Sequence, residues 1–313
     1  MKIVINARYG MPRLKEGLEE LGHEIVENLW RIGHFREQRI DAVIFDLRTI
    51  FNRKWRFPLL AWQLQKLGIP VVMWNVDAPW HMNRAKIRVD ILLKSRLLDI
   101  YATHSLQDTD WIKGTRVLYL PNAAWVSVYN LNGRTIDELR DKRDYRYDVS
   151  FIGNLNGRDH PEHRRRVEFL ARLGEFLQKS NINYRFADAT RDKLGSGDQI
   201  DIIQNSRINL SCLAAADSKG VMSWGLTERA YGVPACGGFL LMEKRVHIKD
   251  DFDEWNEVAT YDGLEECQEK ILYYLGHDEE RRHIMATAHD RVMREHTYRH
   301  RAEALVREIE KFL

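Results

Sequence analysis

Short, continuous apolar runs recur along the first half of the chain, and helical patterns separate them. The runs are rich in β-branched and aromatic residues, and they are too short to be helices. Such runs are typical of strands that helices cover on both faces, as in a parallel sheet. Their alternation with helices predicts a doubly wound α/β fold, in which ligands bind beyond the carboxyl ends of the strands. The runs occupy residues 42–45, 71–74, 100–102 and 117–120, after a first strand-like stretch at 2–6.

The pattern stops once and then restarts, which predicts two domains. Residues 125–146 are polar and charged and contain no run that could form a strand. A new strand-like run begins at Tyr147, followed by a helical pattern and further runs at 208–210 and 239–241. A chain of 313 residues is long enough for two domains. We therefore predict an N-terminal domain at 1–124, a linker at 125–146 and a C-terminal domain at 147–313 that ends in helices.

Composition excludes few classes of partner. The chain has 48 Lys and Arg against 46 Asp and Glu, so the net charge of +2 makes nucleic acid a possible but not a favoured partner. Its three cysteines are scattered, which argues against a disulfide framework or a zinc site. No apolar run approaches the length of a transmembrane helix, and no signal-peptide pattern is present. We expect a cytoplasmic protein, although contact with a membrane surface stays open.

Residues 224–241 contain the most informative motif. A short helix, a turn containing Pro and Gly and a buried strand are expected in that order. Glu228 could accept hydrogen bonds from ribose hydroxyls, and Arg229 offers a planar fork to phosphate oxygens. The pair Gly237-Gly238 would allow close approach of the backbone to a ligand. The alternative is an ordinary helix-to-strand connection, in which these residues only turn the chain.

The stretch from Arg229 to Leu241 resembles the C-terminal signature of the CgeB-like (spore-maturation) glycosyltransferases. Segments at 147–154, 208–211 and 296–301 resemble the same family, and so do 74–79 and 119–124 in the first half. The resemblance implies a GT-B fold, with two Rossmann-like parallel-sheet domains facing a cleft and a helical C-terminus. It further implies a UDP-sugar or another NDP-sugar as donor, no other cofactor and no obligatory metal. The acceptor would be a hydroxyl of a glycan, a protein, a small molecule or modified nucleic acid.

One residue departs from the family pattern. Relatives commonly carry Glu after the aromatic residue of the signature, where this chain has Gly232. Glu228 lies one helical turn earlier and so shares a helix face with that position. Glu228 could therefore hold the donor ribose instead, or the donor could be changed or lost.

A second donor-side candidate is the turn that opens the C-terminal domain. Residues 153–158 follow a strand and precede a helix, where backbone N–H groups favour phosphate. The arginines at 164–166 are more typical of a solvated helix face. The candidate donor-binding residues are Gly153, Asn154, Asn156, Arg158, Ser211, Thr227, Glu228, Arg229, Tyr231, Gly237 and Gly238.

Acceptor-side candidates follow strands of the first domain. Asp77 or His81 could act as a general base if the reaction inverts the anomeric carbon, and Arg229 would stabilise charge on the leaving phosphate. Asp77 could equally be a turn former before Pro79, and His81 an ordinary loop residue. The candidate acceptor-binding residues are Arg8, Tyr9, Gly10, Trp80 and His104.

Other functions are predicted less well. Asp108 and Asp110 have the spacing of a metal motif, but they precede a helical stretch, where Asp is a common cap. The acidic run at 250–253 is more typical of a turn, so we expect no metal site. A non-catalytic nucleotide-sugar binder on a degenerate GT-B scaffold is the main alternative, because of Gly232. A sugar transferase that acts on modified nucleic acid is a further alternative. A dinucleotide-dependent oxidoreductase is disfavoured, because this chain lacks the full Gly-x-Gly-x-x-Gly turn.

Overall fold

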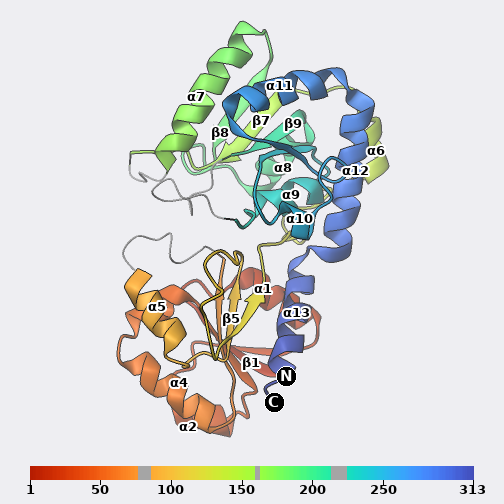
Figure 1. Cartoon of the computed structure of the whole chain (residues 1–313). Helices are drawn as coiled ribbons and strands as arrows, with labels where there is room; N and C mark the ends of the chain where they lie inside the picture. Colours follow the sequence, from red (N-terminus) through yellow and green to blue (C-terminus); the bar gives the residue numbers. More distant parts are fainter. Residues whose placement is uncertain (77–85, 159–162, 213–223) are drawn as a thin grey trace. The chain divides into compact units, whose positions relative to one another are not determined.

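The chain forms two compact units, and the first is built from both ends of the sequence. The computed structural model describes residues 1–76, 86–158, 163–212 and 224–313 (Figure 1). Met1–Asn122 and Tyr298–Leu313 make the first unit, and Ala123–Thr297 make the second. The structure thus groups the last helix with the first unit, whereas the sequence pattern placed it at the end of the C-terminal domain.

The first unit contains a six-stranded parallel sheet. Its order is β2-β1-β3-β4-β5-β6. The strands are β1 (Lys2–Asn6), β2 (Glu24–Glu27), β3 (Ala42–Phe45), β4 (Val71–Asn75), β5 (Ile100–Thr103) and β6 (Arg116–Tyr119). The helices are α1 (Pro12–Glu20), α2 (Ile32–Glu37), α3 (Leu47–Asn52), α4 (Arg56–Lys66), α5 (Lys86–Lys94) and α13 (Tyr298–Glu310).

Helices cover both faces of this sheet. Val43 and Phe45 of β3 belong to one apolar cluster with side chains of α2, α3, α4 and α5. Ile44 is equally buried but projects to the opposite face, because side chains alternate along a strand. On that opposite face α1 packs against α13, and α13 contacts β5. The continuous apolar runs in the sequence are the consequence of this two-sided burial.

The second unit repeats the same strand order. Its five-stranded parallel sheet has the order β11-β10-β9-β7-β8, which is that of the first five strands of the first unit. The strands are β7 (Tyr147–Gly153), β8 (Tyr184–Asp188), β9 (Ser206–Ser211), β10 (Leu240–Glu243) and β11 (Ala259–Tyr261). The helices are α6 (Ile136–Asp141), α7 (Arg164–Lys179), α8 (Ser196–Gln204), α9 (Arg229–Ala235), α10 (Ile248–Asp251), α11 (Gly263–Gly276) and α12 (Asp278–Glu295). The prediction of two doubly wound parallel sheets is confirmed.

The segment expected to be a linker is structured and belongs to the second unit. Helix α6 begins at a capping box, in which Thr135 and Glu138 satisfy each other's backbone N–H groups. Leu139 of this helix is buried and joins the core on the face that α7 and α11 cover. The charged sequence of this stretch is the exposed side of a short amphipathic helix.

Polar contacts fix α13 to the first unit. The buried Arg301 donates a hydrogen bond from Nε to the carbonyl of Pro121 at 3.1 Å. Arg116 of β6 pairs with Glu308 of α13 at 3.0 Å. The ends of the second unit also lie together, since the Ala124 N–H donates to the His296 carbonyl at 2.8 Å. The second unit is therefore an insertion in the first.

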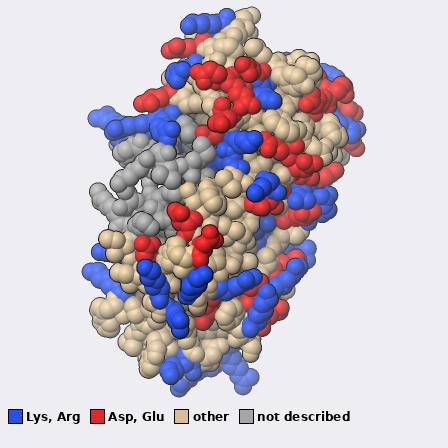
Figure 2. Space-filling model, viewed as in Figure 1, with Lys and Arg blue, Asp and Glu red and all other residues tan. Residues whose placement is uncertain are grey.

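Charged side chains of both signs are interspersed over the face of the molecule in Figure 2. None of the helices in the described ranges combines the length and the apolarity that a membrane-spanning helix needs.

Gly17 allows α1 and α13 to approach each other closely, which generates a prediction on stability. A Cβ atom at this position would lie 2.5 Å from the carbonyl oxygen of Tyr298, and backbone atoms cannot rotate away. We expect Gly17→Ala to lower the free energy of unfolding by about 1–3 kcal/mol in urea denaturation followed by circular dichroism, because the two helices must separate. Gly33→Ala is the control, since a Cβ there meets nothing within 4 Å. Equal stability of the two variants would contradict the close approach.

Candidate functional site

The candidate donor site lies at the carboxyl ends of β7 and β9 in the second unit. These central strands are neighbours, and Phe151 pairs with Leu210 in register. The strand order changes direction here, because β8 lies on one side of β7 whereas β9, β10 and β11 follow on the other. Sheets of this order bind ligands in the crevice outside such a switch point.

A buried arginine joins the two strand ends. Arg166 of α7 donates from Nε to the carbonyl of Cys212 at 3.1 Å and from Nη1 to the carbonyl of Asn154 at 3.2 Å. Its guanidinium also lies 5.7 Å from the ring centre of Phe151. Arg164 and Arg165 are exposed as expected, but the expectation of a solvated face was wrong for Arg166. A run of three arginines cannot reveal by itself which one faces the sheet.

A buried charge pair lies at the end of β10, and it was not predicted from the sequence. Arg245 lies 3.5 Å from the carboxylate of Glu243, and it donates from Nη1 to the carbonyl of Gly225 at 3.2 Å. Both side chains are largely buried. The bond to Gly225 ties the segment before α9 to the carboxyl edge of the sheet. Charged residues directly after a buried strand are the signal that could have identified this pair.

The cysteine that follows β9 is buried. Burial raises the pKa of Cys212 to about 12, although nearby Arg166 acts in the opposite direction. The thiol is therefore protonated at neutral pH. All three cysteines are free and buried, so they act as small apolar residues.

The three polar residues at the start of α9 have different surroundings. Arg229 donates from Nη2 to the Gln199 side chain at 2.8 Å, and Tyr129 donates to the same oxygen at 3.2 Å. The hydroxyl oxygen of Thr227 is buried and has no hydrogen-bond partner among the described residues. Glu228 is half-buried and lies one helical turn before Gly232. Arg229 is thus held in place, whereas Thr227 keeps a hydrogen-bonding group available.

Three predicted donor contacts are core residues instead. Tyr231 is fully buried, and its hydroxyl donates to Asp251 at 3.0 Å. A Cβ on Gly237 would lie 2.4 Å from Leu139, and one on Gly238 would lie 2.5 Å from Ile203. The structure thus places Tyr231, Gly237 and Gly238 within the packed core of the second unit. Glycine is required at both positions because other side chains already fill the space.

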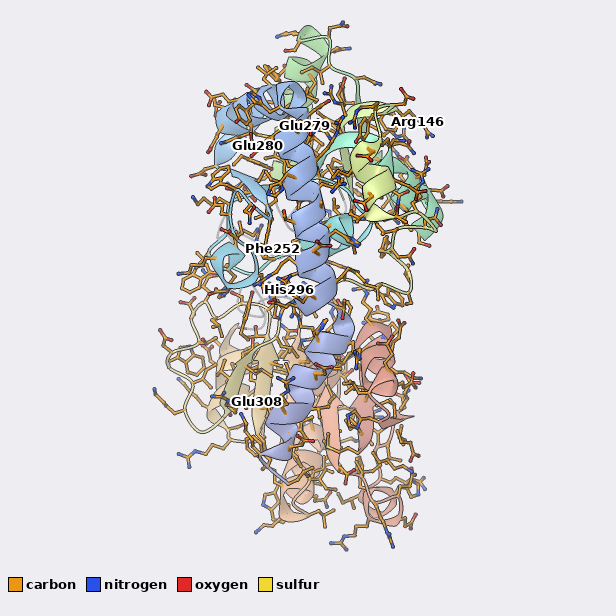
Figure 3. The ribbon with its side chains drawn as sticks, turned by 90° about the vertical axis from the view of Figure 1, so that its right-hand side faces the viewer. Arg146, Phe252, Glu279, Glu280, His296 and Glu308 are labelled. Carbon is orange, nitrogen blue, oxygen red and sulfur yellow. The ribbon has the colours of Figure 1, made fainter. Side chains whose placement is uncertain are left out.

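Tyr231 belongs to an aromatic cluster beneath α9. Its ring lies 5.7 Å from the rings of both Phe252 and His296. Phe252 and His296 lie side by side, with ring centres 5.4 Å apart (Figure 3). His296 thus packs against the signature helix, and the acidic run at 250–253 contributes Asp251 to the same cluster.

The turn after β7 is held by its own side chains. The side-chain oxygen of Asn154 accepts a hydrogen bond from the backbone N–H of Asn156 at 2.8 Å. The side-chain oxygen of Asn156 accepts one from the backbone N–H of Arg158 at 3.2 Å. Arg158 is exposed. Gly153 and Ser211 end neighbouring strands, so both lie at the switch point. There the hydroxyl of Tyr261 donates a hydrogen bond to the carbonyl of Ser211 at 3.1 Å.

The acceptor-side candidates of the first unit divide into separate groups. Arg8 and Tyr9 are exposed beyond the end of β1, and Gly10 has a φ of 68°. His104 directly follows β5 and is buried. Its backbone N–H donates to the carbonyl of Asn75 at 3.3 Å. Asp77, Trp80 and His81 lie outside the described residues.

A polar pocket opens at the carboxyl ends of β1 and β2. Its volume is about 410 Å³. Arg8 contributes to its wall, and Arg53 lies over the ring of Trp30 at 3.7 Å. Among the described residues, neither arginine has a carboxylate partner. The lining residues are Ala7, Arg8, Asn28, Trp30, Thr49, Asn52 and Arg53.

Comparisons with known proteins agree on the class of the chain. Residues 134–307 match a family described as glycosyl transferase-like. No curated protein matches the sequence. Solved structures match over nearly the whole length and confirm the GT-B fold class.

Three of these structures illustrate the likeness. Sucrose-phosphate synthase from Thermosynechococcus elongatus has a TM-score of 0.65 at 8% identity, with 99% of each chain covered. A glycosyltransferase from Rickettsia africae has a TM-score of 0.60 at 10% identity, covering 99% of this chain and 98% of that one. HepE from Anabaena, solved with UDP, has a TM-score of 0.59 at 12% identity, covering 99% of this chain and 100% of that one.

The Arg166 contacts lead to a prediction on stability. Arg166→Met keeps an aliphatic side chain but leaves the carbonyls of Asn154 and Cys212 without their donor. We expect the free energy of unfolding to fall by about 2 kcal/mol or more, because each buried unsatisfied group costs about 1–3 kcal/mol. Arg165→Met, one residue away and exposed, should change it by no more than about 0.5 kcal/mol. Urea denaturation measures both, and similar stability of the two variants would show that Arg166 does not hold the strand ends.

Proposed function

Because the chain belongs to the glycosyl transferase-like family, we propose that it transfers a sugar from a nucleoside-diphosphate sugar to an acceptor hydroxyl. The second unit holds the donor, and the first unit holds the acceptor. The observation that carries this assignment is the switch point of the second sheet, where Arg166 and the Glu243–Arg245 pair lie at the strand ends. The UDP bound to HepE from Anabaena supports the donor class.

Arg229 is the proposed contact to the leaving diphosphate. Its guanidinium is half-buried, and Gln199 and Tyr129 orient it. A fixed guanidinium stabilises charge that develops on a leaving phosphate, because it needs no reorganisation during the reaction. Thr227 supplies a hydroxyl from the same segment.

Glu228 is the proposed contact to the donor ribose. Gly232 lies on the same face of α9, and a Cβ built there meets nothing within 4 Å. A side chain at position 232 can therefore begin without a clash at its Cβ. The carboxylate of Glu228 can reach the region beside Gly232 from one turn earlier, since residues four apart are neighbours on a helix.

Moving the carboxylate between these two positions tests the donor site. Calorimetry with UDP-glucose, GDP-mannose and dTDP-glucose identifies the donor base. We expect Glu228→Ala to weaken binding of the preferred donor by about tenfold or more, because a hydrogen bond to a charged group is lost. Gly232→Glu in the same variant should restore most of the affinity.

The controls separate binding from folding and from catalysis. Glu269→Ala removes an exposed carboxylate of α11 and should leave donor affinity unchanged. Arg229→Ala should abolish saturable binding. Unchanged affinity in Glu228→Ala would remove Glu228 from the site, and donor binding without turnover would favour the non-catalytic alternative.

The polar pocket beside β1 is the proposed acceptor site. The guanidinium of Arg53 lies over the ring of Trp30, and its N–H groups can donate to an oxyanion. Arg8 adds a second cation to the same wall. An acceptor that carries a phosphate or a carboxylate near its hydroxyl fits this lining better than a neutral saccharide.

Charge removal in the pocket tests the acceptor class. We expect wild-type protein to bind glucose 6-phosphate more tightly than glucose in ligand-observed NMR titrations. Arg53→Gln should weaken glucose 6-phosphate binding by about tenfold, because a charge-assisted hydrogen bond is lost. Arg48→Gln changes an exposed arginine of α3 that does not line the pocket and is the control. Equal binding of the sugar and its phosphate would contradict an anionic acceptor.

A further inference from the structure

Helix α4 carries large apolar side chains on its solvent-facing side as well as on its buried side. Phe57, Leu60 and Leu64 face the core of the first unit. Leu59 and Trp62 are nevertheless 48% and 53% exposed, and Trp55, directly before the helix, is 69% exposed. The exposed residues follow the spacing i, i+4 and i+7, so they form one stripe along the helix. A contiguous exposed apolar stripe marks an interaction surface, because scattered single residues would not align in this way.

Helix α5 on the same face of the sheet also carries exposed apolar side chains. Ile87 and Ile91 are 75% and 63% exposed and are one turn apart. Val89 and Leu92 of α5 belong to the same core cluster as the buried side of α4. Both helices therefore cover the same face of the sheet, and their outer sides face the same way (Figure 1). We name the exposed residues Trp55, Leu59, Trp62, Ile87 and Ile91 the outer apolar face.

Cations flank the part of the outer apolar face that lies on α4. Residues 47–76 contain no Asp or Glu. Lys66 lies 5.7 Å from the ring of Trp62, and Arg56 lies 5.7 Å from the ring of Trp55. Within the described ranges, none of the cations of α4 pairs with a carboxylate. The cations of residues 47–76 are Arg48, Arg53, Lys54, Arg56 and Lys66.

A small pocket continues the basic rim beside Trp62. Its volume is about 240 Å³, and it lies between α2 and α4. Arg36 and Lys66 both line it, next to Ile32. Two cations thus converge at the end of the stripe, where a phosphate group could lie against apolar side chains.

From this combination we infer that the outer apolar face binds the surface of a bilayer that contains anionic lipids. Tryptophan rings favour the boundary between headgroups and acyl chains, and lysine and arginine favour anionic headgroups. An amphipathic helix with these two residue classes on its free side is typical of proteins that lie on a membrane. The first unit would rest on the lipid through α4 and α5 without any segment crossing it.

The charges disfavour other occupants. In a two-fold contact with a second copy, the same surface patch would face itself, so cations would oppose cations. Single-stranded nucleic acid binds through ring stacking, and Leu59, Ile87 and Ile91 offer no ring. An anionic bilayer satisfies both the cations and the aliphatic side chains.

Vesicle co-sedimentation tests the inference. The full chain is mixed with vesicles of phosphatidylcholine alone or with about one third phosphatidylglycerol. We expect at least about tenfold tighter binding to the anionic vesicles, weakened by added salt. The double variant Trp55→Ser/Trp62→Ser should lose about tenfold in affinity. Lys54→Glu/Arg56→Glu should lose a similar amount and also the salt dependence.

The control is an exposed tryptophan elsewhere. Trp255 in the second unit is 44% exposed, with Lys270 at 4.1 Å from its ring, so Trp255→Ser removes a similar side chain. It should leave vesicle binding unchanged. Wild-type protein that stays in the supernatant with anionic vesicles would overturn the inference, and so would variants that bind as well as wild type. A dimer in sedimentation velocity that Trp62→Ser dissociates would assign this face to a second copy instead.

Discussion

The arrangement of the candidate donor site depends on the buried guanidinium of Arg166. The helices that follow β7 and β9 lie on opposite faces of the sheet, since α7 contributes to one apolar cluster and α9 to the other. The carbonyls of Asn154 and Cys212 lie just beyond these strands. Arg166 donates hydrogen bonds to both carbonyls and so connects the ends of the two strands. The start of α7, the turn after β7 and the end of β9 are thereby held as one group.

Two units with the same strand order use this edge differently. In the second unit, the guanidinium of Arg166 lies at this edge and joins the ends of β7 and β9. In the first unit, the corresponding edge opens into a polar pocket whose wall is the stacked pair of Trp30 and Arg53. The strand order therefore fixes where a site lies, whereas the side chains beyond the strands decide what it can bind.

The sequence predicted the central strands well and missed three of the four strands at the edges of the sheets. Central strands such as β3, β4 and β9 are buried on both faces, so they appear as continuous apolar runs. The strands that were missed, β2, β8 and β11, are all edge strands. β2 reads Glu-Ile-Val-Glu and is half exposed, and β11 has only three residues. Neither gives a run long enough to be distinguished from a loop.

The candidate site was predictable in position but only partly in its residues. The motif around Thr227, Glu228 and Arg229 and the turn at Gly153 both lie at the expected edge of the sheet. Tyr231, Gly237 and Gly238 belong to the core, and Arg166 and the Glu243–Arg245 pair were not anticipated. Each of these differences concerns burial. Burial depends on which residues distant in sequence meet, and a local motif does not contain that information.

The insertion of the second unit into the first has a consequence for the order of folding during synthesis. Residues 1–122 leave the ribosome first, but α1 then lacks the helix against which it packs. The second unit is continuous in sequence, and its ends meet at Ala124 and Thr297, so it can fold as soon as it has emerged. The first unit becomes complete only when residues 298–313 arrive. The first unit, most of which precedes the second in sequence, is thus completed after it, and until then its face beneath α13 lacks that helix.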